Sequence, residues 1–350
     1  MKRILFFLTL CVLQGCIKPF DFEVDEGAKK LVVNGMITNE PGPYTVKINK
    51  TTSYGGHFSD VHDDILKAQV TITDDLGTVE TLKEFKPGEF VTDPNGIRGR
   101  IGGKYTLRIK LKNGEEYVSE TETLPAVSNI DRFYFQHREV LSLNAENNEV
   151  RTPYFEMRVD LKDAATEKNY YRWVSLGTYE IETQPENFTT QDKNGNPRSS
   201  PKSCCRQCWV RRVDYSAAVT SDRDFDGKNL IGMPVANIPI TPEFFGIKYH
   251  IELKQYSISE KVFYFWKTLE SQTAGTGSVQ DPAPANARGN ITNINNPDEQ
   301  VLGYFGASGV VTKTMYMGPR DVPFSLSKFV FPDDCRVIPG ATTTKPSFWQ

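Results

Sequence analysis

The residues best suited to chemistry in this sequence are four cysteines, three of which fall close together. Cys204, Cys205 and Cys208 form a cluster, and Cys335 follows far along the chain. Thiols at this spacing form disulfides or, as thiolates, hold a zinc ion. Because adjacent cysteines fit tetrahedral zinc geometry poorly, we predict disulfides, with Cys335 bonded to a member of the cluster. Four cysteines allow three connectivities, and zinc is kept as the alternative.

A second group of candidate ligands is acidic. Asp222, Asp224 and Asp226 alternate along the chain and are followed by Gly227, which matches the opening of a calcium-binding loop. The twelfth position of such a loop holds a bidentate Glu, but here it is Met233. The neighbouring sequence predicts no helix on either side. We therefore interpret the stretch as a solvated turn and keep calcium as the alternative.

Two histidines and three aspartates also gather between residues 57 and 64, namely His57, Asp60, His62, Asp63 and Asp64. Such a set could bind a metal, but polar residues at this density are typical of a surface loop. The whole chain has only four histidines, and it lacks the motifs of serine hydrolases, zinc proteases and phosphate-binding loops. We predict that the protein is not an enzyme and needs no cofactor.

The N-terminus predicts the compartment in which these side chains work. Two basic residues precede an apolar run from Ile4 to Leu13, and small Gly15 then stands beside Cys16. This is the pattern of a lipoprotein signal, in which the cysteine left by cleavage receives acyl chains such as palmitate. Two or three chains hold a protein to a membrane far more firmly than one. The run is also shorter than the roughly 20 residues that span a bilayer.

Residues 1–15 are therefore expected to be a removed signal peptide, and residues 16–28 an acidic tether that carries the lipid on Cys16. Ile17 replaces the Asp that retains many lipoproteins at the inner membrane, which favours the outer membrane. Whether the body faces the periplasm or the outside stays open. Export to an oxidising compartment also favours disulfides among the cysteines that remain.

Composition favours strands and argues against nucleic acid as a partner. The 350 residues carry 41 Lys and Arg against 44 Asp and Glu, for a net charge of −3, and no basic run stands out. Aromatic side chains reach 11%, with 21 Phe and 15 Tyr, and such residues are enriched in β-strands. A chain of this length suits two domains.

Alternating apolar residues predict a β-sandwich over residues 29–125. In residues 104–111, for example, Tyr105, Leu107 and Ile109 share one face, and Asn113-Gly114 then predicts a type I′ turn. About seven short strands in roughly 100 residues are typical of an immunoglobulin-like sandwich, and the spacing is also similar to that of carboxypeptidase-regulatory-like modules. The clearest strands are expected at residues 31–37, 44–49, 68–73, 104–111 and 116–122.

The stretch Leu124-Pro125-Ala126 breaks this pattern, and a larger β-rich domain is expected over residues 129–350. The aromatic run Tyr170-Tyr171-Arg172-Trp173 could stack on a sugar, but alternating aromatics in a strand are typical of a core. Residues 184–203 are polar and predict an exposed loop. Longer strands are expected at residues 131–136, 154–161, 170–181 and 248–256.

One amphipathic helix is predicted at residues 257–272, where Ser257 and Glu260 form a capping box ahead of an apolar stripe. Its stripe is expected to pack on a sheet. Residues 273–299 follow as a loop rich in Gly, Pro and Asn. A connection of this length is unusual in a compact domain unless it has a function, so this loop is our candidate binding region.

These features occur together with several longer motifs. The motifs are Cys204-Cys205-x-x-Cys208-Trp209, the helix running into Phe265-Trp266-Lys267, Asp281-Pro282-x-Pro284-Ala285-x-x-Arg288-Gly289-Asn290, Val301-Leu302-Gly303-Tyr304-Phe305-Gly306-Ala307-Ser308-Gly309 and Lys345-Pro346-Ser347-Phe348-Trp349. In this combination the chain resembles the Bacteroidota lipoproteins catalogued as domain of unknown function 4249. The resemblance covers almost the whole mature chain. It implies an outer-membrane lipoprotein, often encoded near TonB-dependent receptors, but it carries over no catalytic residues.

Together these observations predict a mainly β, lipid-anchored outer-membrane protein that is a non-catalytic accessory or ligand-binding partner of a TonB-dependent transporter. A structural or adhesive surface protein is the alternative. The ligand and the oligomeric state are left open, because fold alone does not identify them.

Overall fold

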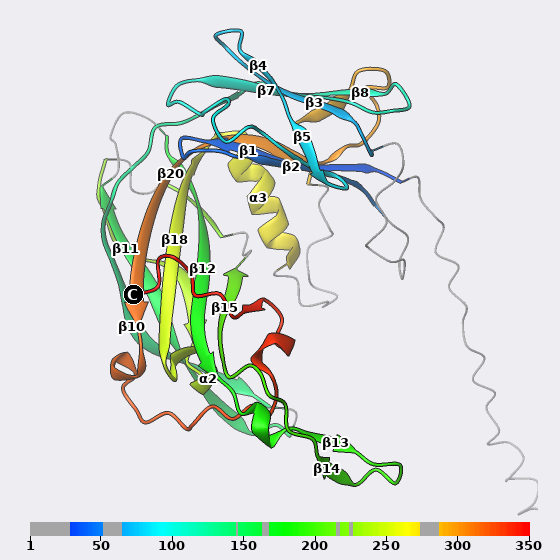
Figure 1. Cartoon of the computed structure of the whole chain (residues 1–350). Coiled ribbons are helices and arrows are strands. Elements are labelled where there is room, and N and C mark those ends of the chain that lie inside the picture. Colours follow the sequence, from blue (N-terminus) through cyan, green and yellow to red (C-terminus); the bar gives the residue numbers. More distant parts are fainter. Residues whose placement is uncertain are drawn as a thin grey trace, which may run out of the picture.

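The computed structural model describes residues 29–51, 65–144, 146–162, 168–214, 218–223, 227–273 and 287–350. Cys16 with its tether, and the polar stretch 57–64, lie outside these residues. Figure 1 shows a β-sandwich lying across one end of a taller β-rich body. The mainly β fold class predicted from the sequence is confirmed. In the described part of the chain, no helix combines the length and the apolar character needed to cross a membrane.

The sandwich consists of two sheets that face each other. One sheet holds β1 (Leu31–Thr38), β2 (Thr45–Lys50), β5 (Lys83–Lys86), β6 (Glu89–Val91) and the start of β20 (Leu302–Met317). The other holds β3 (Gln69–Asp74), β4 (Val79–Thr81), β7 (Lys104–Lys110), β8 (Glu116–Ser119), β9 (Glu122–Thr123) and β19 (Ile291–Asn293). The assignment of this sandwich to the immunoglobulin-like class stays a prediction.

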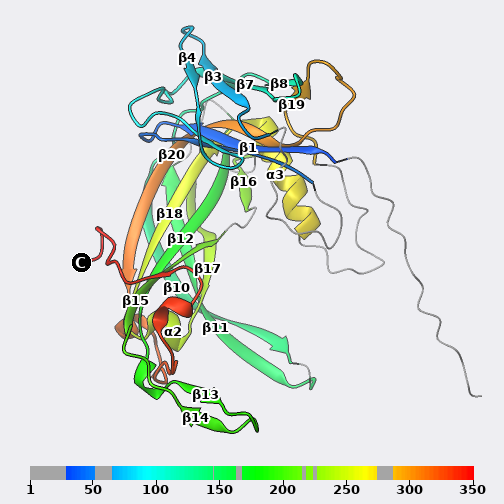
Figure 2. The same cartoon turned by 45° about the vertical axis from the view of Figure 1, so that its right-hand side comes forward.

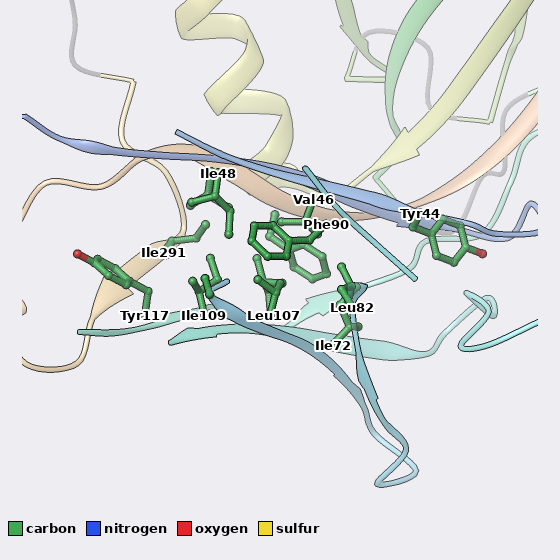
Figure 3. Close-up of a cluster of buried hydrophobic side chains, with 14 of the residues drawn as sticks. Tyr44, Val46, Ile48, Ile72, Leu82, Phe90, Leu107, Ile109, Tyr117 and Ile291 are labelled. Carbon is green, nitrogen blue, oxygen red and sulfur yellow. The ribbon is translucent and has the colours of Figure 1, made fainter. Parts of the chain in front are cut away.

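Side chains from both sheets meet in one apolar core. Val46, Ile48 and Phe90 point from the first sheet toward Leu107 and Ile109 of the second (Figure 3). These side chains are at most 1% exposed. In β7 the residues between them, such as Arg108, face solvent, so the alternation predicted from the sequence is confirmed. Burial of each large apolar side chain stabilises the fold by about 1.5 to 3 kcal/mol.

The turn between β7 and β8 differs from the predicted type I′ turn. A type I′ turn needs a positive φ at both central residues. Here Gly114 has φ +91°, whereas Asn113 is not among the described residues with positive φ. The Gly114 N–H donates to the Leu111 carbonyl at 3.0 Å, and the Asn113 side chain accepts from the Glu115 N–H at 3.1 Å. The prediction was wrong because the asparagine side chain stabilises a longer turn, in which only the glycine needs the left-handed conformation.

The second domain also packs one sheet on another. Its larger sheet contains β12 (Tyr170–Glu182), β15 (Gln207–Asp214), β16 (Val219–Ser221), β18 (Lys248–Ile258), the end of β20 and β21 (Ala341–Thr342). Its smaller sheet contains β10 (Ile130–Leu143), β11 (Glu149–Lys162) and β17 (Asn229–Pro239). Tyr171 and Trp173 are buried in the core between them, in agreement with the core interpretation of the aromatic run.

Shorter elements complete this domain. The polar stretch 184–203 carries an exposed hairpin of β13 (Thr189–Gln191) and β14 (Pro197–Ser199). The short helix α2 (Pro242–Phe245) covers the core near the far end of the body. Single 3-10 turns lie at Pro185–Asn187, Pro319–Asp321 and Cys335–Val337.

Strand β20 belongs to both domains. Residues 302–308 pair in parallel with β1, and residues 309–317 pair antiparallel with β18. Ile291, Val301 and Phe305 are also part of the sandwich core. The sandwich therefore extends beyond the predicted range 29–125 and takes its last two strands from a segment more than 160 residues later in the chain.

Helix α3 (Glu260–Thr273) packs beside the point where β20 passes between the domains (Figure 1). It begins later than the predicted residue 257, because β18 continues through Ile258 and places Ser257 opposite Gly309. Ser259 takes the capping position, and its hydroxyl lies 3.4 Å from the Val262 nitrogen. The Glu260 carboxylate accepts a bond from the Tyr170 hydroxyl at 2.7 Å. The Ser257–Glu260 capping box was therefore wrong, since strand pairing extends past Ser257.

Gly309 is the residue at which β20 changes partners, and it should tolerate no side chain. A Cβ there would lie 2.7 Å from the Pro125 carbonyl oxygen and 2.4 Å from a Val127 methyl. We expect Gly309→Ala to lower the free energy of unfolding by about 1 to 3 kcal/mol through overpacking. Gly306→Ala is the matched control in the same strand, because its Cβ would meet only a Val262 methyl at 3.9 Å. Urea unfolding of both variants tests this, and equal losses would contradict it.

Candidate functional site: a groove beside helix α3

A groove of about 1030 Å³ runs between helix α3 and residues 288–301. One wall is the helix face made by Lys261, Tyr264, Phe265 and Thr268, which recur at helical spacing. The opposite wall is the described end of the predicted 273–299 loop. Residues 274–286 of that loop lie outside the described part. The groove therefore lies in the region that the sequence singled out for binding.

The second wall is ordered, in contrast to the structureless loop predicted for residues 273–299. β19 pairs with β8 and places Thr292 opposite Val118. The buried Asn290 side chain accepts from the Phe305 N–H at 3.0 Å and donates to the Phe305 carbonyl at 2.8 Å. The equally buried Asn293 side chain accepts from the Asn295 N–H at 2.8 Å. The prediction failed here because asparagine side chains and pairing with β8 hold this segment in place. Neither leaves a periodic pattern of apolar residues in the local sequence.

A buried carboxylate joins the two walls behind the groove. Glu122 is 3% exposed, and its carboxylate accepts from the hydroxyls of Tyr304 at 2.7 Å and Ser259 at 2.9 Å, and from Asn290 at 3.3 Å. Burial raises the pKa of Glu122, although these hydrogen bonds oppose the shift. The same cluster raises the pKa of Tyr304, through burial and then the nearby Glu122 charge. Glu122 thus ties the helix cap, β9, β20 and the second wall together.

The exposed surface of the groove is mixed in character. Tyr264 presents a ring that is 57% exposed, and Lys261 forms an ion pair with Glu120. Arg288 and Asp298 line the groove without an ion pair to any described residue. Among the described residues, the lining includes no His or Cys and no nucleophile with an adjacent base. An aromatic face flanked by both charge signs suits binding of a polar partner.

The predicted calcium loop is described only in part. Asp222 is 3% exposed, and its carboxylate accepts from the Asn169 N–H at 2.6 Å. Its own N–H donates to the Asn169 carbonyl at 3.0 Å, so Asp222 fastens β16 to the start of β12. Asp224 and Asp226 lie outside the described residues. The interpretation as a solvated turn does not hold for Asp222, which is buried, and the calcium alternative stays untested.

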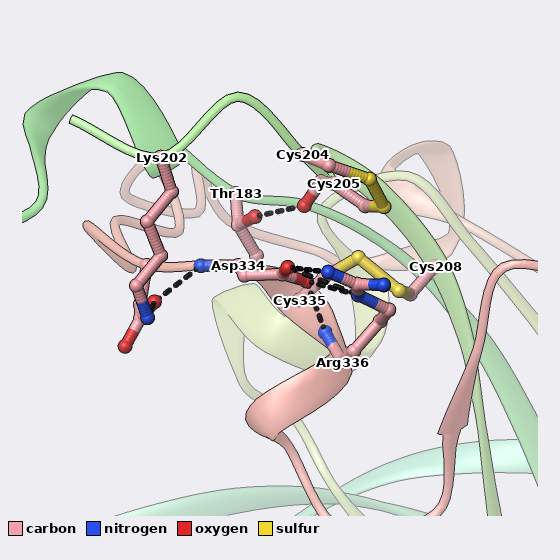
Figure 4. A network of polar contacts seen from close by, with 9 residues as sticks. Thr183, Lys202, Cys204, Cys205, Cys208, Asp334, Cys335 and Arg336 are labelled. Atoms are coloured by element: carbon pink, nitrogen blue, oxygen red, sulfur yellow. Dashed lines mark hydrogen bonds and ion pairs between the residues drawn. A yellow bond between two sulfur atoms is a disulfide. The ribbon is translucent and has the colours of Figure 1, made fainter.

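The four cysteines form two disulfides, shown in Figure 4. Cys208 is bonded to Cys335, as predicted for Cys335 and the cluster, and their Cα atoms lie 5.9 Å apart. Cys204 is bonded to Cys205. The sulfurs of this second pair lie near the Asp334 carboxylate, but disulfide sulfur does not supply the thiolates that zinc needs.

Asp334 holds the segment around Cys335 in place. Its carboxylate accepts from the Arg336 backbone and guanidinium, and the Cys335 N–H donates to the Cys205 carbonyl at 3.0 Å (Figure 4). The bonds from Arg336 lower the pKa of Asp334 to about 2. The C-terminal segment is thus fastened to β15 by one covalent bond and several polar ones.

Sequence reasoning missed most of the groove. Glu122 stood in a predicted strand as an ordinary polar residue, and Asn290 was noted only within a family motif. Sixteen lining residues come from four separated stretches of chain, so no local pattern unites them. By simple alternation Glu122 falls on the same face as Glu116 and Glu120, so no sequence pattern indicated that it is buried; that follows from the break between β8 and β9.

The Cys208–Cys335 bond should stabilise the fold far more than the Cys204–Cys205 bond. The first joins residues 127 positions apart, whereas the second joins neighbours. Since stabilisation grows with the length of chain enclosed, we expect the pair Cys208→Ala and Cys335→Ala to cost about 2 to 4 kcal/mol in urea unfolding. The pair Cys204→Ala and Cys205→Ala is the matched control and should cost less. Equal effects of the two double variants would contradict this account.

Glu122 should make the stability depend on pH. A carboxyl whose folded pKa lies above its unfolded value supports folding while protonated, and loses that contribution as the pH rises through the folded pKa. Relative to Glu122→Gln, the wild type should therefore lose stability between pH 4 and pH 8, as measured by urea unfolding. For Glu116 the hydrogen bond from Lys110 lowers the pKa, so the wild-type advantage over Glu116→Gln should be lost only below the ordinary pKa of 4.5 and stay constant from pH 5 to pH 8. A wild-type advantage over Glu122→Gln that grows with pH would refute this.

The comparisons with known proteins identify the family of this chain but assign it no activity. A search of curated proteins found no match. The family model described as "Domain of unknown function (DUF4249)" matches residues 17–314, and this range includes the sandwich, most of the second domain, helix α3 and both walls of the groove. The chain therefore belongs to the DUF4249 family.

Proposed function

We propose that this protein is a non-catalytic binding accessory, anchored to the outer membrane through lipid on Cys16, that engages its partner with the groove beside α3. The family resemblance suggests a TonB-dependent transporter, or the ligand of such a transporter, as the partner. The observation that carries the proposal is an open groove that exposes the Tyr264 ring, with Arg288 and Asp298 outside any ion pair to a described residue and hydrogen-bonded groups beneath. Exposed aromatics beside ordered polar groups are typical of interaction sites.

The position of the groove along the chain also supports this proposal. The Lys30 amine donates to the Gln300 side chain at 2.5 Å, and Gln300 lines the groove. Lys30 lies fourteen positions after Cys16 in the chain. A fully extended segment of that length spans at most about 50 Å, at roughly 3.6 Å per residue. An anchor on Cys16 would therefore keep the groove within reach of an integral membrane partner.

A surface on the other domain favours the adhesive alternative. Strands β10 and β11 form a long hairpin, and β17 pairs with β11 only from Tyr154 onward, so the hairpin tip projects from the body (Figure 2). Val140, Leu141 and Leu143 at this tip are 50 to 63% exposed. Apolar side chains gathered on a projecting tip are typical of contact with another macromolecule.

Site-specific photo-cross-linking separates these two functions. A photoreactive phenylalanine analogue replaces Tyr264 in the groove, Leu143 at the hairpin tip or, as the control, Phe85, which is 69% exposed on β5. We expect position 264, irradiated in intact cells, to give an adduct with an integral outer-membrane protein that copurifies in mild detergent. The reason is that only a partner seated in the groove comes within bonding distance of that ring.

The control position decides how an adduct is interpreted. Phe85 should give none, because it faces solvent away from the groove. Adducts from position 143 alone would favour the adhesive function, and identical adducts from positions 264 and 85 would mean random collision. Absence of any adduct at position 264 would contradict the groove as the binding surface.

A further inference from the structure

Arg172 on β12 is a buried cation without a carboxylate partner among the described residues. Its side chain is 7% exposed, and it takes part in no ion pair or hydrogen bond with the described residues. Its Nε is fully enclosed and unsatisfied. By contrast Arg158, which is also largely enclosed on β11, forms an ion pair with Glu156 and donates to the Gly232 carbonyl at 2.8 Å. An unpaired buried charge costs several kcal/mol, so this arrangement needs an explanation.

Aromatic rings hold the guanidinium in one position. Its central carbon lies 3.8 Å from the ring centroid of Trp266 on α3 and 6.0 Å from that of Tyr256 on β18. Such stacking favours the charged form but makes no hydrogen bond to the edge of the guanidinium, which has no partner among the described residues. Burial lowers the pKa of Arg172 to about 10, so the group still carries its charge at neutral pH. Arg172 is thus a positive charge held against Trp266 of α3, and no described carboxylate neutralises it.

A second donor lies next to this charge. Tyr256 pairs with Arg172 across the β12–β18 ladder, so the two side chains share one face of the sheet. The Tyr256 hydroxyl also makes no hydrogen bond to the described residues. Neighbouring acidic groups are engaged elsewhere, since Glu260 accepts from the Tyr170 hydroxyl at 2.7 Å and Glu40 pairs with Lys254 at 2.8 Å.

We infer that Arg172 and Tyr256 form a binding site for a small organic monocarboxylate. The planar guanidinium edge matches a carboxylate, and the Tyr256 hydroxyl supplies a further donor. One positive charge neutralises one carboxylate, whereas a phosphate dianion would leave a negative charge buried. The rings of Trp266 and Tyr256 favour a flat apolar group beside the carboxylate. This site is distinct from the α3 groove, because Trp266 is absent from the groove lining, and the inference does not rest on the proposed function.

Thermal unfolding of the full chain in detergent tests this site with three probes, namely benzoate, acetate and inorganic phosphate, each against sodium chloride at matched ionic strength. Benzoate should raise the melting temperature most, by about 3 °C at roughly ten times its dissociation constant, and phosphate least. In Arg172→Met the benzoate response should disappear, because the positive charge is gone. In Tyr256→Phe, which keeps the ring and the fold, it should weaken.

Arg158→Met is the matched control, since that arginine already has its carboxylate, and the benzoate response should persist there. If benzoate stabilises the wild type no more than chloride does, the inference is overturned. A response that survives in both Arg172→Met and Tyr256→Phe also overturns it. A larger effect of phosphate would overturn the assignment to carboxylates. Should Arg172→Met fail to fold, an undiminished response in Tyr256→Phe overturns the site by itself.

Discussion

Strand β20 hydrogen-bonds to β1 along its first half and to β18 along its second half, and this shared pairing sets the relative position of the two domains. The Asn39 side chain extends the contact past the end of the β1 ladder, because it accepts from the Val310 N–H at 2.6 Å and donates to the Val310 carbonyl at 3.3 Å. A β-ladder resists bending at any single residue, so the sandwich and the body form a continuous framework.

Helix α3 packs against this framework and presents side chains on two sides of the contact. Its buried face, with Val262 and Phe265, packs on Tyr304 of β20 and on Ile258, the last residue of β18. Around this contact the helix presents Tyr264 to the groove and Trp266 to Arg172. Glu122 adds a polar connection from the sandwich to the start of the helix. One 14-residue helix therefore positions both candidate binding surfaces.

The two surfaces differ in how the protein satisfies their charged groups. In the groove, exposed charges are solvated or paired at the surface, where an ion pair contributes little to stability. Glu122 is buried and accepts three hydrogen bonds, whereas the buried Arg172 side chain contacts aromatic rings and has no ion pair or hydrogen bond to a described residue. Membership in the DUF4249 family leaves both sites without an assigned ligand. The proposed accessory function rests on the exposed groove and on the family setting. The proposed carboxylate site rests on the buried Arg172.

The sequence alone determined the β-strands with regular alternation, the position of the amphipathic helix to within three residues, and the bond from Cys335 to the cysteine cluster, because these depend on local periodicity and side-chain type. Only the tertiary structure decided that residues 291–308 complete the sandwich, that Glu122 meets Tyr304 and Asn290, and that Arg172 is buried away from every described acidic side chain. Those features depend on pairing between segments distant in sequence. Gly303, Gly306 and Gly309 also interrupt the apolar pattern of β20, so local periodicity did not reveal the strand on which the whole arrangement depends.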